Sequence, residues 1–402
     1  MSAKFDDPKQ RRKILAAGGF AHFVHDGFTD SIYVLLPFWA EAFGLSLAQV
    51  GALKLAVSGA LSALQVPAGL LAEKLGERPV LVAGTLISAA AFIGVGLAGG
   101  ITTLVMALVL VGVGAGTQHP LASAIISKAH PGHGRRAALG TYNFCGDLGK
   151  VAVPALVAAI AAAVGWRYGA VAAGLFGVFA GVVIIIVFRR LAVGGPTTQK
   201  AARDVVIKAE GWGIVDRRGF ASLSVIAMID STVRYGFLTF LPFLLIGKGS
   251  PVEKVGFALV LVFAGGAVGK LVCGLIAERV GILRTVIITE VATGILVAAI
   301  VILPLTPALF VLPLAGIALN GTSSVLYGTV ADFVAADRQA RAFGLFYTLA
   351  LTVGAVAPVV YGLVSDRWGV EVTFLTMAAS IVLVAPFCAI LRLSLKLPDT
   401  RS

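Results

Sequence analysis

Ionisable side chains interrupt the first long apolar run of this sequence, FAHFVHDGFTDSIYVLLPF at residues 20–38. His22, Asp26 and Asp30 are spaced four residues apart, so in a helix they share one face, and His25 lies off that face. Burial and a second acid nearby both favour the neutral form of a carboxyl group, which can then take up and release a proton. We therefore expect Asp26, Asp30 and His22 to bind protons. The alternative is a structural polar patch that hydrogen-bonds a neighbouring helix.

Two further groups of ionisable residues lie in later apolar runs. Asn143, Asp147 and Lys150 form one helical stripe, and Asp230 and Arg234 stand four residues apart. Asp147 with Lys150, and Asp230 with Arg234, are predicted ion pairs within their own helices. Lys150 and Arg234 each fall near the middle of a run, in opposite halves of the chain, where two cations could hold an anion between them. The alternative is that both pairs are structural only.

Four other residues are candidates of the same kind. Lys54 and Lys270 are cations within apolar runs, and each could contact an anion or form an ion pair at a gate. His119 precedes Pro120, which can kink a helix, so His119 could line a cavity or pack at the kink. Glu290 is expected to bond a nearby charged loop. Taken together, Lys150, Arg234, His119, Asn143, Lys54 and Lys270 are the predicted anion-binding residues, and no cofactor is expected.

The elements that position these residues must lie in lipid. The chain has 402 residues, of which 58% are hydrophobic and 13% charged, against about 25% charged in ordinary soluble domains. Apolar runs of about 20 residues, each long enough to cross a bilayer, recur along the chain. The predicted spans are 16–43, 48–72, 80–99, 102–127, 137–163, 167–188, 219–246, 252–277, 285–304, 308–331, 342–364 and 372–392. This pattern predicts an all-α membrane protein with twelve transmembrane helices.

The basic residues predict how the chain is oriented. Most of the 32 Lys and Arg residues fall in the N-terminal tail, in alternate loops, in the segment 189–218 and near the C-terminus. Only Arg167, Lys248, Lys254 and Arg367 fall in the loops of the other side. Because basic loops stay in the cytoplasm, both termini are predicted to be cytoplasmic, in a multi-pass protein of the inner membrane. The same distribution accounts for the net charge of +12 without a nucleic-acid partner.

The second half of the chain repeats the first. GLLAEKLGERPVL at 69–81 is echoed by GLIAERVGILRTV at 274–286, and GTQHP at 116 by GTSSV at 321, both at a displacement of 205. Such a displacement predicts two pseudo-symmetric six-helix bundles, residues 1–188 and 219–402, joined by a basic cytoplasmic linker at 189–218. Six helices, a linker and six helices is the arrangement of transporters that rock two bundles about a central site.

The repeated loop resembles the gating loop of the major facilitator superfamily, and this resemblance covers nearly the whole chain. It implies that the cytoplasmic side is locked by two loops, with Glu73 and Glu278 at the position usually held by Asp. The implied gating residues are Gly69, Glu73, Gly76 and Arg78 in the first copy and Gly274, Glu278, Arg279 and Gly281 in the second.

A narrower resemblance rests on HFVHDGFTDSIYVLLPF from residue 22 and on GVGAGTQHPLASAIISKAHPGHGRRAALGTYNFCGDLGKVAVPAL at 112–156. These segments look like the fosmidomycin-resistance branch of the superfamily, in which a His and an Asp stand four residues apart in the first helix and a His-Pro pair occurs in the fourth. The branch resemblance implies export of a small phosphonate-type drug, coupled to the entry of protons.

The sequence as a whole predicts a secondary active transporter that moves a small organic anion, of the phosphonate or carboxylate type, by alternating access and proton-coupled export. Its expected partners are that anion, protons and the lipid bilayer, and the chain is expected to be a monomer. A divalent-metal transporter using His22, Asp26 and His119 is one alternative, although four intramembrane cations would repel a metal ion. A membrane hydrolase would need a nucleophile or a metal-bound water, and no nucleophile motif is present, so no enzyme activity is expected.

Overall fold

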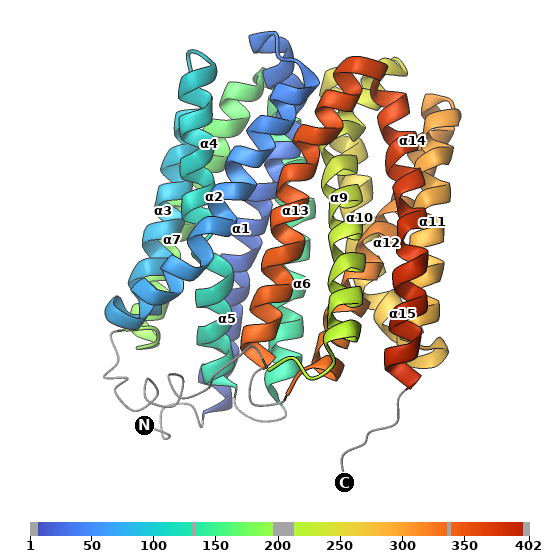
Figure 1. The fold of residues 1–402 in the computed structure, drawn as a ribbon. Helices are drawn as coiled ribbons and strands as arrows, with labels where there is room; N and C mark the ends of the chain where they lie inside the picture. The colour runs from blue at the N-terminus through green and yellow to red at the C-terminus, as the bar shows by residue number, and fades with distance from the viewer. Residues whose placement is uncertain (1–6, 131–133, 196–212, 336–338, 397–402) are drawn as a thin grey trace. The chain divides into compact units, whose positions relative to one another are not determined.

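The computed structural model describes residues 7–130, 134–195, 213–335 and 339–396. These residues form long helices and short helical turns, with one isolated bridge between Ile214 and Val334. Helices α1 to α7 are blue to green in Figure 1, and α9 to α15 are yellow-green to red. Residues 196–212 of the predicted linker lie outside the described residues. The predicted all-α membrane fold is confirmed.

The first seven helices fall in the first half of the chain. They are α1 (Pro8–Phe43), α2 (Leu47–Leu75), α3 (Glu77–Gly96), α4 (Ile101–Ala115), α5 (Gln118–Ala129), α6 (Gly134–Val164) and α7 (Trp166–Arg190). The second half holds α9 (Arg217–Gly247), η2 (Val252–Lys254), α10 (Val255–Val280), α11 (Ile282–Ile302), α12 (Leu305–Thr329), η3 (Val330–Phe333), α13 (Gln339–Trp368), α14 (Val370–Ser380), η4 (Ile381–Leu383) and α15 (Val384–Lys396).

Contacts divide the chain into two compact units. The first holds the described residues of Met1–Gly44, Leu53–Val205 and Val252–Val260, and the second holds those of Leu45–Ala52, Val206–Pro251 and Leu261–Ser402. In the first unit α1 packs against α6 and α3 packs against α7. In the second unit α9 packs against α13 and α11 against α12. Every side-chain arrangement described below lies within one of these two units.

Eleven helical segments among the described residues are long and apolar enough to cross a membrane. The remaining predicted span, 16–43, corresponds to α1, which has 36 residues and is longer than a bilayer requires. Its buried His22, His25 and Asp26 and the basic residues of its first two turns lower its mean hydropathy. The helix therefore resembles a span by its length and by its apolar C-terminal half. The least apolar of these long helices therefore carries the acids noted in the sequence.

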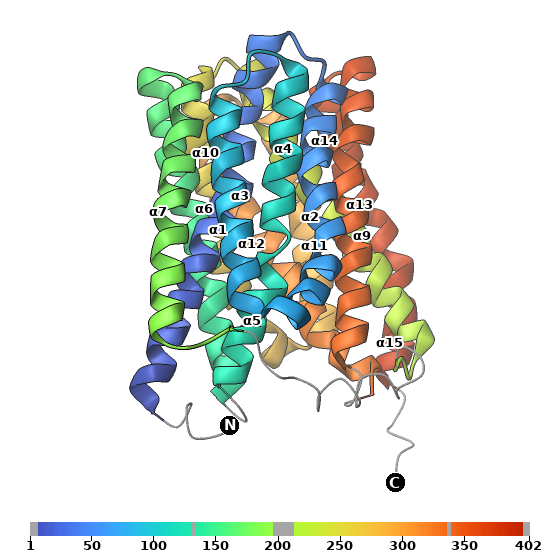
Figure 2. The same ribbon diagram turned by 90° about the vertical axis from the view of Figure 1, so that its left-hand side faces the viewer.

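The predicted span 102–127 consists of two helices, α4 and α5, which follow one another in Figure 2. The helical run breaks at Gly116 and Thr117, four and three residues before Pro120. Proline has no backbone N–H, so the carbonyl of Gly116 loses its normal helical partner, and the ring of Pro120 crowds the same carbonyl. The kink predicted at Pro120 is therefore a break one turn earlier, and it sets the direction of His119 in the first turn of α5.

Glycines in the left-handed region mark equivalent turns in the two halves. Gly76, between α2 and α3, has φ +90°, and Gly281, between α10 and α11, has φ +93°. Gly165 and Gly369, before α7 and α14, have φ +103° and +91°. Residues with a Cβ rarely adopt this conformation, so each turn requires glycine. The turns of the two halves are built alike, as the repeat in the sequence predicts.

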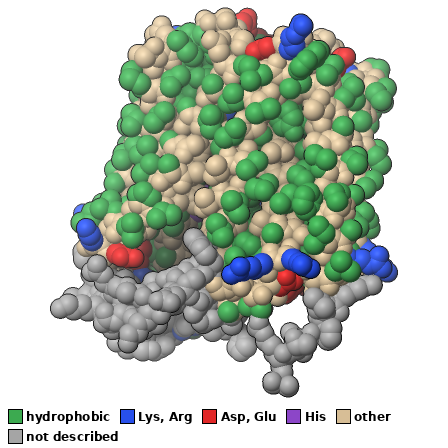
Figure 3. Space-filling model, viewed as in Figure 1, with side chains coloured by type: hydrophobic (Ala, Val, Ile, Leu, Met, Phe, Trp, Pro, Cys, Tyr) green, Lys and Arg blue, Asp and Glu red, His purple; other side chains and the backbone are tan. Residues whose placement is uncertain are grey.

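Apolar side chains cover the lateral surface of the helices, whereas charged side chains gather near the helix ends (Figure 3). Large apolar residues that are more than half exposed include Phe179 and Leu175 on α7 and Ile295 on α11. Soluble proteins rarely expose contiguous apolar surface of this kind. The exposed apolar surface is therefore the surface that faces lipid.

Candidate functional site

Glycines bring α1 and α6 into close contact in the first unit. A Cβ on Gly149 would lie 2.0 Å from the backbone oxygen of Phe23, and one on Gly27 would lie 2.5 Å from a methyl carbon of Val153. A Cβ on Gly146 would lie 2.7 Å from the His22 ring. Small residues allow helix backbones to approach closely in this way. The polar face of α1 is thereby pressed against the polar stripe of α6.

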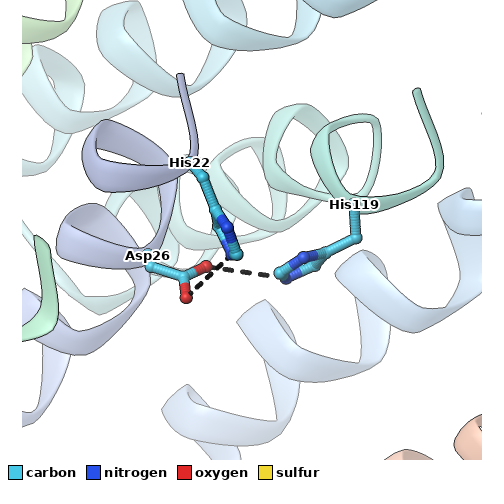
Figure 4. Close-up of side chains that lie close together, drawn as sticks. All are labelled: His22, Asp26 and His119. Carbon is cyan, nitrogen blue, oxygen red and sulfur yellow. Dashed lines mark ion pairs between the residues drawn. The ribbon is translucent and has the colours of Figure 1, made fainter. Parts of the chain in front are cut away.

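Asp26 is the centre of the resulting cluster, and only 8% of its side chain is exposed. Its Oδ2 lies 3.1 Å from Nε2 of His22 and 3.2 Å from Nζ of Lys150, and its Oδ1 lies 3.6 Å from Nε2 of His119. Figure 4 shows His22 and His119 converging on this carboxyl group from α1 and α5. Lys150 also lies 3.7 Å from Oδ1 of Asp147. The structure thus brings together His22, Asp26, His119, Asp147 and Lys150.

The two ring nitrogens of His22 have different partners, and these partners set its chemistry. Nδ1 of His22 is 2.9 Å from the backbone oxygen of Tyr142, which can only accept, so Nδ1 carries a hydrogen. Nε2 of a neutral ring would then turn a lone pair toward a carboxylate oxygen 3.1 Å away. That contact is favourable only when a proton sits on Nε2 or on the carboxyl group. The His22–Asp26 contact is therefore one at which a proton can be taken up.

Lys54 and Asp30 extend the charged cluster along α1 and α2. The ammonium group of Lys54 is buried and lies 4.0 Å from the centre of the Tyr33 ring. Asp30 lies close enough to interact electrostatically with both Lys54 and Lys150. Two lysines thus face three carboxyl groups, those of Asp26, Asp30 and Asp147. One proton on the His22–Asp26 pair would balance the formal charge of these five groups.

His25 belongs to a different contact. Its Nε2 is 2.8 Å from the Thr85 hydroxyl, which itself donates to the backbone oxygen of Leu81 at 2.9 Å. The hydroxyl hydrogen is already used, so Nε2 of His25 is the donor, and Thr85 fixes the ring against α3. His25 therefore joins α1 to α3, apart from the face that holds Asp26.

The predicted residues of the second unit lie on several helices. Asp230 is buried on α9, and Arg234, one turn later, is close enough to interact with it electrostatically. An amino group of Arg234 lies 3.4 Å from the Ser231 hydroxyl. Lys270 is partly buried on α10, where its backbone oxygen accepts a hydrogen bond from Ser324 at 3.3 Å. In the first unit, Asn143 is exposed on α6.

The α2–α3 turn is held by the predicted Arg78 and by its neighbour Glu77. Arg78 donates its backbone N–H to the oxygen of Gly194 at 2.6 Å, and its side chain points to the end of α7. Glu77, which was not among the predicted gating residues, forms an ion pair with Lys128 at the end of α5. Glu73 is exposed. These contacts link the α2–α3 turn to the ends of α5 and α7.

Two of the four glycines predicted in the gating loops are required by the backbone conformation. Gly76 and Gly281 have positive φ angles, as described above. A Cβ on Gly69 or Gly274 would meet no atom of the described residues within 4 Å. Among the described residues, no close contact therefore requires glycine at these two positions. Glu278 and Arg279 of the second copy are both exposed.

The cluster also has the donor set of a metal site. His22, Asp26 and His119 each offer one ligand atom, and these atoms lie within 4.8 Å of one another. Imidazole and carboxylate suit divalent transition metals. The ammonium group of Lys150, however, lies 3.2 Å from the Asp26 oxygen that would ligate a metal. The donor set fits a metal ion, but the charge around it does not.

Comparison with known proteins identifies the family. The model of the Major Facilitator Superfamily matches residues 18–349 and 223–401, and the chain therefore belongs to this superfamily. Among curated relatives, a protein described as a probable sulfoacetate transporter of Cupriavidus necator is 26% identical, over 90% of this chain and 89% of the relative. The fosmidomycin resistance protein of Escherichia coli is 24% identical over 96% and 93%, and the 4-hydroxybenzoate transporter of Pseudomonas putida is 23% identical over 80% and 79%.

Solved structures agree with this assignment at the level of the fold. A bacterial homolog of the human lysosomal transporter Spinster has a TM-score of 0.80 at 18% identity, covering 97% of this chain and 98% of that chain. A nucleoside transporter has a TM-score of 0.75 at 14% identity, covering 94% and 99%. The protein is a multi-pass membrane transporter of a small molecule and not an enzyme. The resemblance to the fosmidomycin-resistance branch is confirmed.

Proposed function

We propose that this protein transports a small organic anion, of the carboxylate or phosphonate type, by alternating access coupled to protons. The observation that carries the proposal is Asp26, held between His22 at 3.1 Å and Lys150 at 3.2 Å. The Asp26 carboxyl group thus contacts both His22, which can share a proton with it, and Lys150, a cation that can bind an anion. The relatives named for sulfoacetate, 4-hydroxybenzoate and fosmidomycin are consistent with this substrate class.

The ion pair also favours a direction of coupling. When Asp26 is ionised it occupies Lys150, and an anion must compete with it. When Asp26 is protonated, Lys150 loses its shorter ion pair and keeps the 3.7 Å contact with Asp147, so an anion meets less competition for it. An anion beside Asp26 in turn stabilises the protonated form. Proton and anion therefore bind to the same state, which gives cotransport in one direction. The export against protons expected from the sequence would require each ligand to exclude the other.

The remaining predicted residues keep their roles as parts of this proposal. Arg234 and Lys270 in the second unit, with Lys54, His119 and Asn143 in the first, are the further candidates for anion contact. Three contacts lie at one end of the first unit. Lys128 pairs with Glu77, Arg78 reaches the backbone oxygen of Phe188, and the Gln10 side chain donates to the backbone oxygen of Leu191 at 3.2 Å. We assign this basic end to the cytoplasm, with both termini, in an inner membrane. We propose a monomer as the working unit.

The proposal is tested by measuring pH and anion uptake together in proteoliposomes that contain the full chain. Sulfoacetate, 4-hydroxybenzoate and fosmidomycin are added outside, and a pH-sensitive dye is enclosed. Cotransport predicts that a transported anion acidifies the interior. Asp26→Asn mimics the protonated acid, so we expect it to retain exchange of labelled for unlabelled anion and to lose the acidification. Lys150→Gln is expected to lose both.

Glu41→Gln is the matched control, because Glu41 is an exposed acid on the same helix as Asp26. It is expected to behave as the wild type. Alkalinisation of the interior during anion uptake would refute cotransport and support exchange. If Lys150→Gln transported sulfoacetate, 4-hydroxybenzoate and fosmidomycin at the wild-type rates, the proposed contact between Lys150 and the anion would be refuted.

Divalent-metal transport is the second candidate, and the three convergent ligand atoms of His22, Asp26 and His119 favour it. Titration calorimetry with Zn²⁺ and Mn²⁺ distinguishes the two functions. Lys150 is already paired with the Asp26 carboxyl group that would ligate a metal. We therefore expect the wild type and His119→Gln to give the same calorimetric result, without tight metal binding. Tight binding that depends on His119, together with metal-driven currents, would replace the anion proposal.

A further inference from the structure

Glu290 on α11 is a buried acid that the site described above does not use. Only 3% of the residue is exposed, and its Oε1 has no hydrogen-bond partner among the described residues. The sequence suggested that Glu290 bonds the nearby charged loop. The structure instead turns its carboxyl group into the interior of the second unit, against the hydroxyl of Thr322 on α12.

Several titratable or charged groups face Glu290 from the surrounding helices. Asp230 and Arg234 on α9 are both near enough to interact with it electrostatically. Cys388 on α15 is close to the Glu290 carboxyl group, and Tyr327 on α12 is close to Asp230 and Arg234. At neutral pH the thiol and the phenol are uncharged. Two carboxyl groups and one guanidinium group therefore determine the charge of this region.

The hydroxyl groups beside Glu290 form a chain with one direction. Thr289 lies 2.9 Å from the backbone oxygen of Thr285, which can only accept, so the Thr289 hydroxyl is the donor there. Thr322 lies 2.7 Å from the Thr289 oxygen and must donate to it. The single hydroxyl hydrogen of Thr322 is then used. Glu290 can hydrogen-bond the Thr322 oxygen only as a donor, that is, in its protonated form.

The formal charges lead to the same result. Asp230 and Glu290, if both ionised, would leave one uncompensated negative charge beside Arg234, the one cation that acts on both of them among the described residues. An uncompensated buried charge is costly, as is a carboxylate oxygen with no hydrogen-bond donor. One proton removes both costs. The unpartnered Oε1 and the direction of the threonine chain favour Glu290 over Asp230 as the group that carries this proton.

We propose that Glu290 is a second proton-binding site of this transporter, in which Glu290 and Asp230 share one proton and Arg234 balances the remaining charge. The site lies wholly within the second unit, whereas the His22–Asp26 pair lies in the first. Its part in transport rests on the proposed function, but proton binding at Glu290 does not. If both sites are loaded once per cycle, a monovalent anion crosses with about two protons and carries net positive charge.

Proton binding is measured without any substrate, by infrared spectroscopy of the full chain in liposomes between pH 5 and 9. A protonated buried carboxyl group has its own C=O stretching band. We expect such a band near neutral pH in the wild type, its loss in Glu290→Gln, and its retention in Glu371→Gln. Glu371 is the matched control because it is an exposed acid of the second unit. An unchanged spectrum of Glu290→Gln would overturn the proposal.

Asp230→Asn tests the sharing of the proton, and it remains informative if Glu290→Gln does not fold. With Asp230 neutral, Glu290 is the only acid beside Arg234 and is expected to ionise. The Glu290 band should therefore disappear near neutral pH although Glu290 is still present. A band that persists in Asp230→Asn would refute the shared proton.

Transport supplies the second measurement, with 4-hydroxybenzoate as a monovalent probe. When one net charge moves per cycle, a membrane potential of about 100 mV changes the accumulation ratio about 50-fold. Glu290→Gln is expected to remove this dependence on potential and to keep the dependence on the pH gradient. Equal dependence on potential in wild type and variant would overturn the second site. Absence of anion transport in the wild type would instead refute the proposed function and leave the infrared result intact.

Discussion

Gly146→Ala is the substitution that tests the geometry of the Asp26 cluster most directly. Gly146 lies on α6, against the polar face of α1. A Cβ placed there would lie 2.7 Å from Nε2 of His22 and 2.8 Å from Oδ2 of Asp26. The added methyl group carries no charge and removes no hydrogen bond. Any effect on transport must therefore come from displacement of these two side chains.

The expected magnitude follows from these distances. The His22 ring must move by about 0.7 Å for a 2.7 Å contact to reach the 3.4 Å at which ordinary packing begins. Overpacking of this kind costs about 1–3 kcal/mol, and the better helix propensity of alanine returns about 1 kcal/mol. Net stability should fall by about 0–2 kcal/mol. Displacing a positioned group by nearly 1 Å can cost about 100-fold, so we expect proton-coupled uptake to fall about 10- to 100-fold.

The assay compares Gly146→Ala with Gly140→Ala, on the same helix and six residues earlier. A Cβ on Gly140 would meet no atom of the described residues within 4 Å, so this control should keep full transport and equal or higher thermal stability. Acidification of proteoliposomes and the thermal unfolding midpoint are measured for both variants. If Gly146→Ala transports as well as Gly140→Ala, the close contact between α6 and the His22–Asp26 pair is not needed for function.

Three further predictions concern turns, caps and buried polar groups. Gly76→Ala forces a Cβ into φ +90° and should lower stability by about 1–2 kcal/mol, measured by thermal unfolding, whereas Gly69→Ala should be neutral. Asp216 caps α9. Partial burial raises the pKa of its carboxyl group, but hydrogen bonds from the first backbone N–H groups of α9 lower the pKa by more, so the net pKa is below the ordinary value. Asp216→Ala should therefore cost about 1 kcal/mol at neutral pH, and this difference should vanish as the pH falls below about 4; a constant difference would contradict the cap. Thr85→Val leaves the buried His25 N–H without an acceptor and should cost about 1–3 kcal/mol, and an unchanged unfolding midpoint would show that this bond is not formed.

The helices and their polar faces were predictable because they depend on local pattern. Runs of about 20 apolar residues must be helical in lipid, since the backbone has no other way to satisfy its hydrogen bonds there. The spacing of four residues places His22 and Asp26 on one face of any helix. The break before α5 was predictable in kind, from Pro120, although not at its position, because the lost hydrogen bond lies four residues before the proline.

The partners of these residues could not be predicted with the same certainty, because they come from other helices. The stripe on α6 indicated Lys150 as part of a pair with Asp147, its neighbour three residues away, yet Lys150 lies closer to Asp26, at 3.2 Å against 3.7 Å. Likewise, Glu73 had the position of the family motif, but Glu77 makes the ion pair. Sequence spacing limits which side chains share a face, whereas the packing of helices decides which faces meet.

The sequence by itself determined the class of the protein: its apolar composition requires lipid, and its repeat requires two halves built alike. It also determined that acids and histidines lie together on α1. The tertiary structure alone decided that Gly146 and Gly149 press α6 onto that face, which brings Tyr142 to His22 and Lys150 to Asp26. It likewise decided that Glu290 is turned inward to a threonine hydroxyl. The reason is physical: the protonation of a buried group depends on its donors and acceptors in three dimensions, and these belong to helices far apart in the chain.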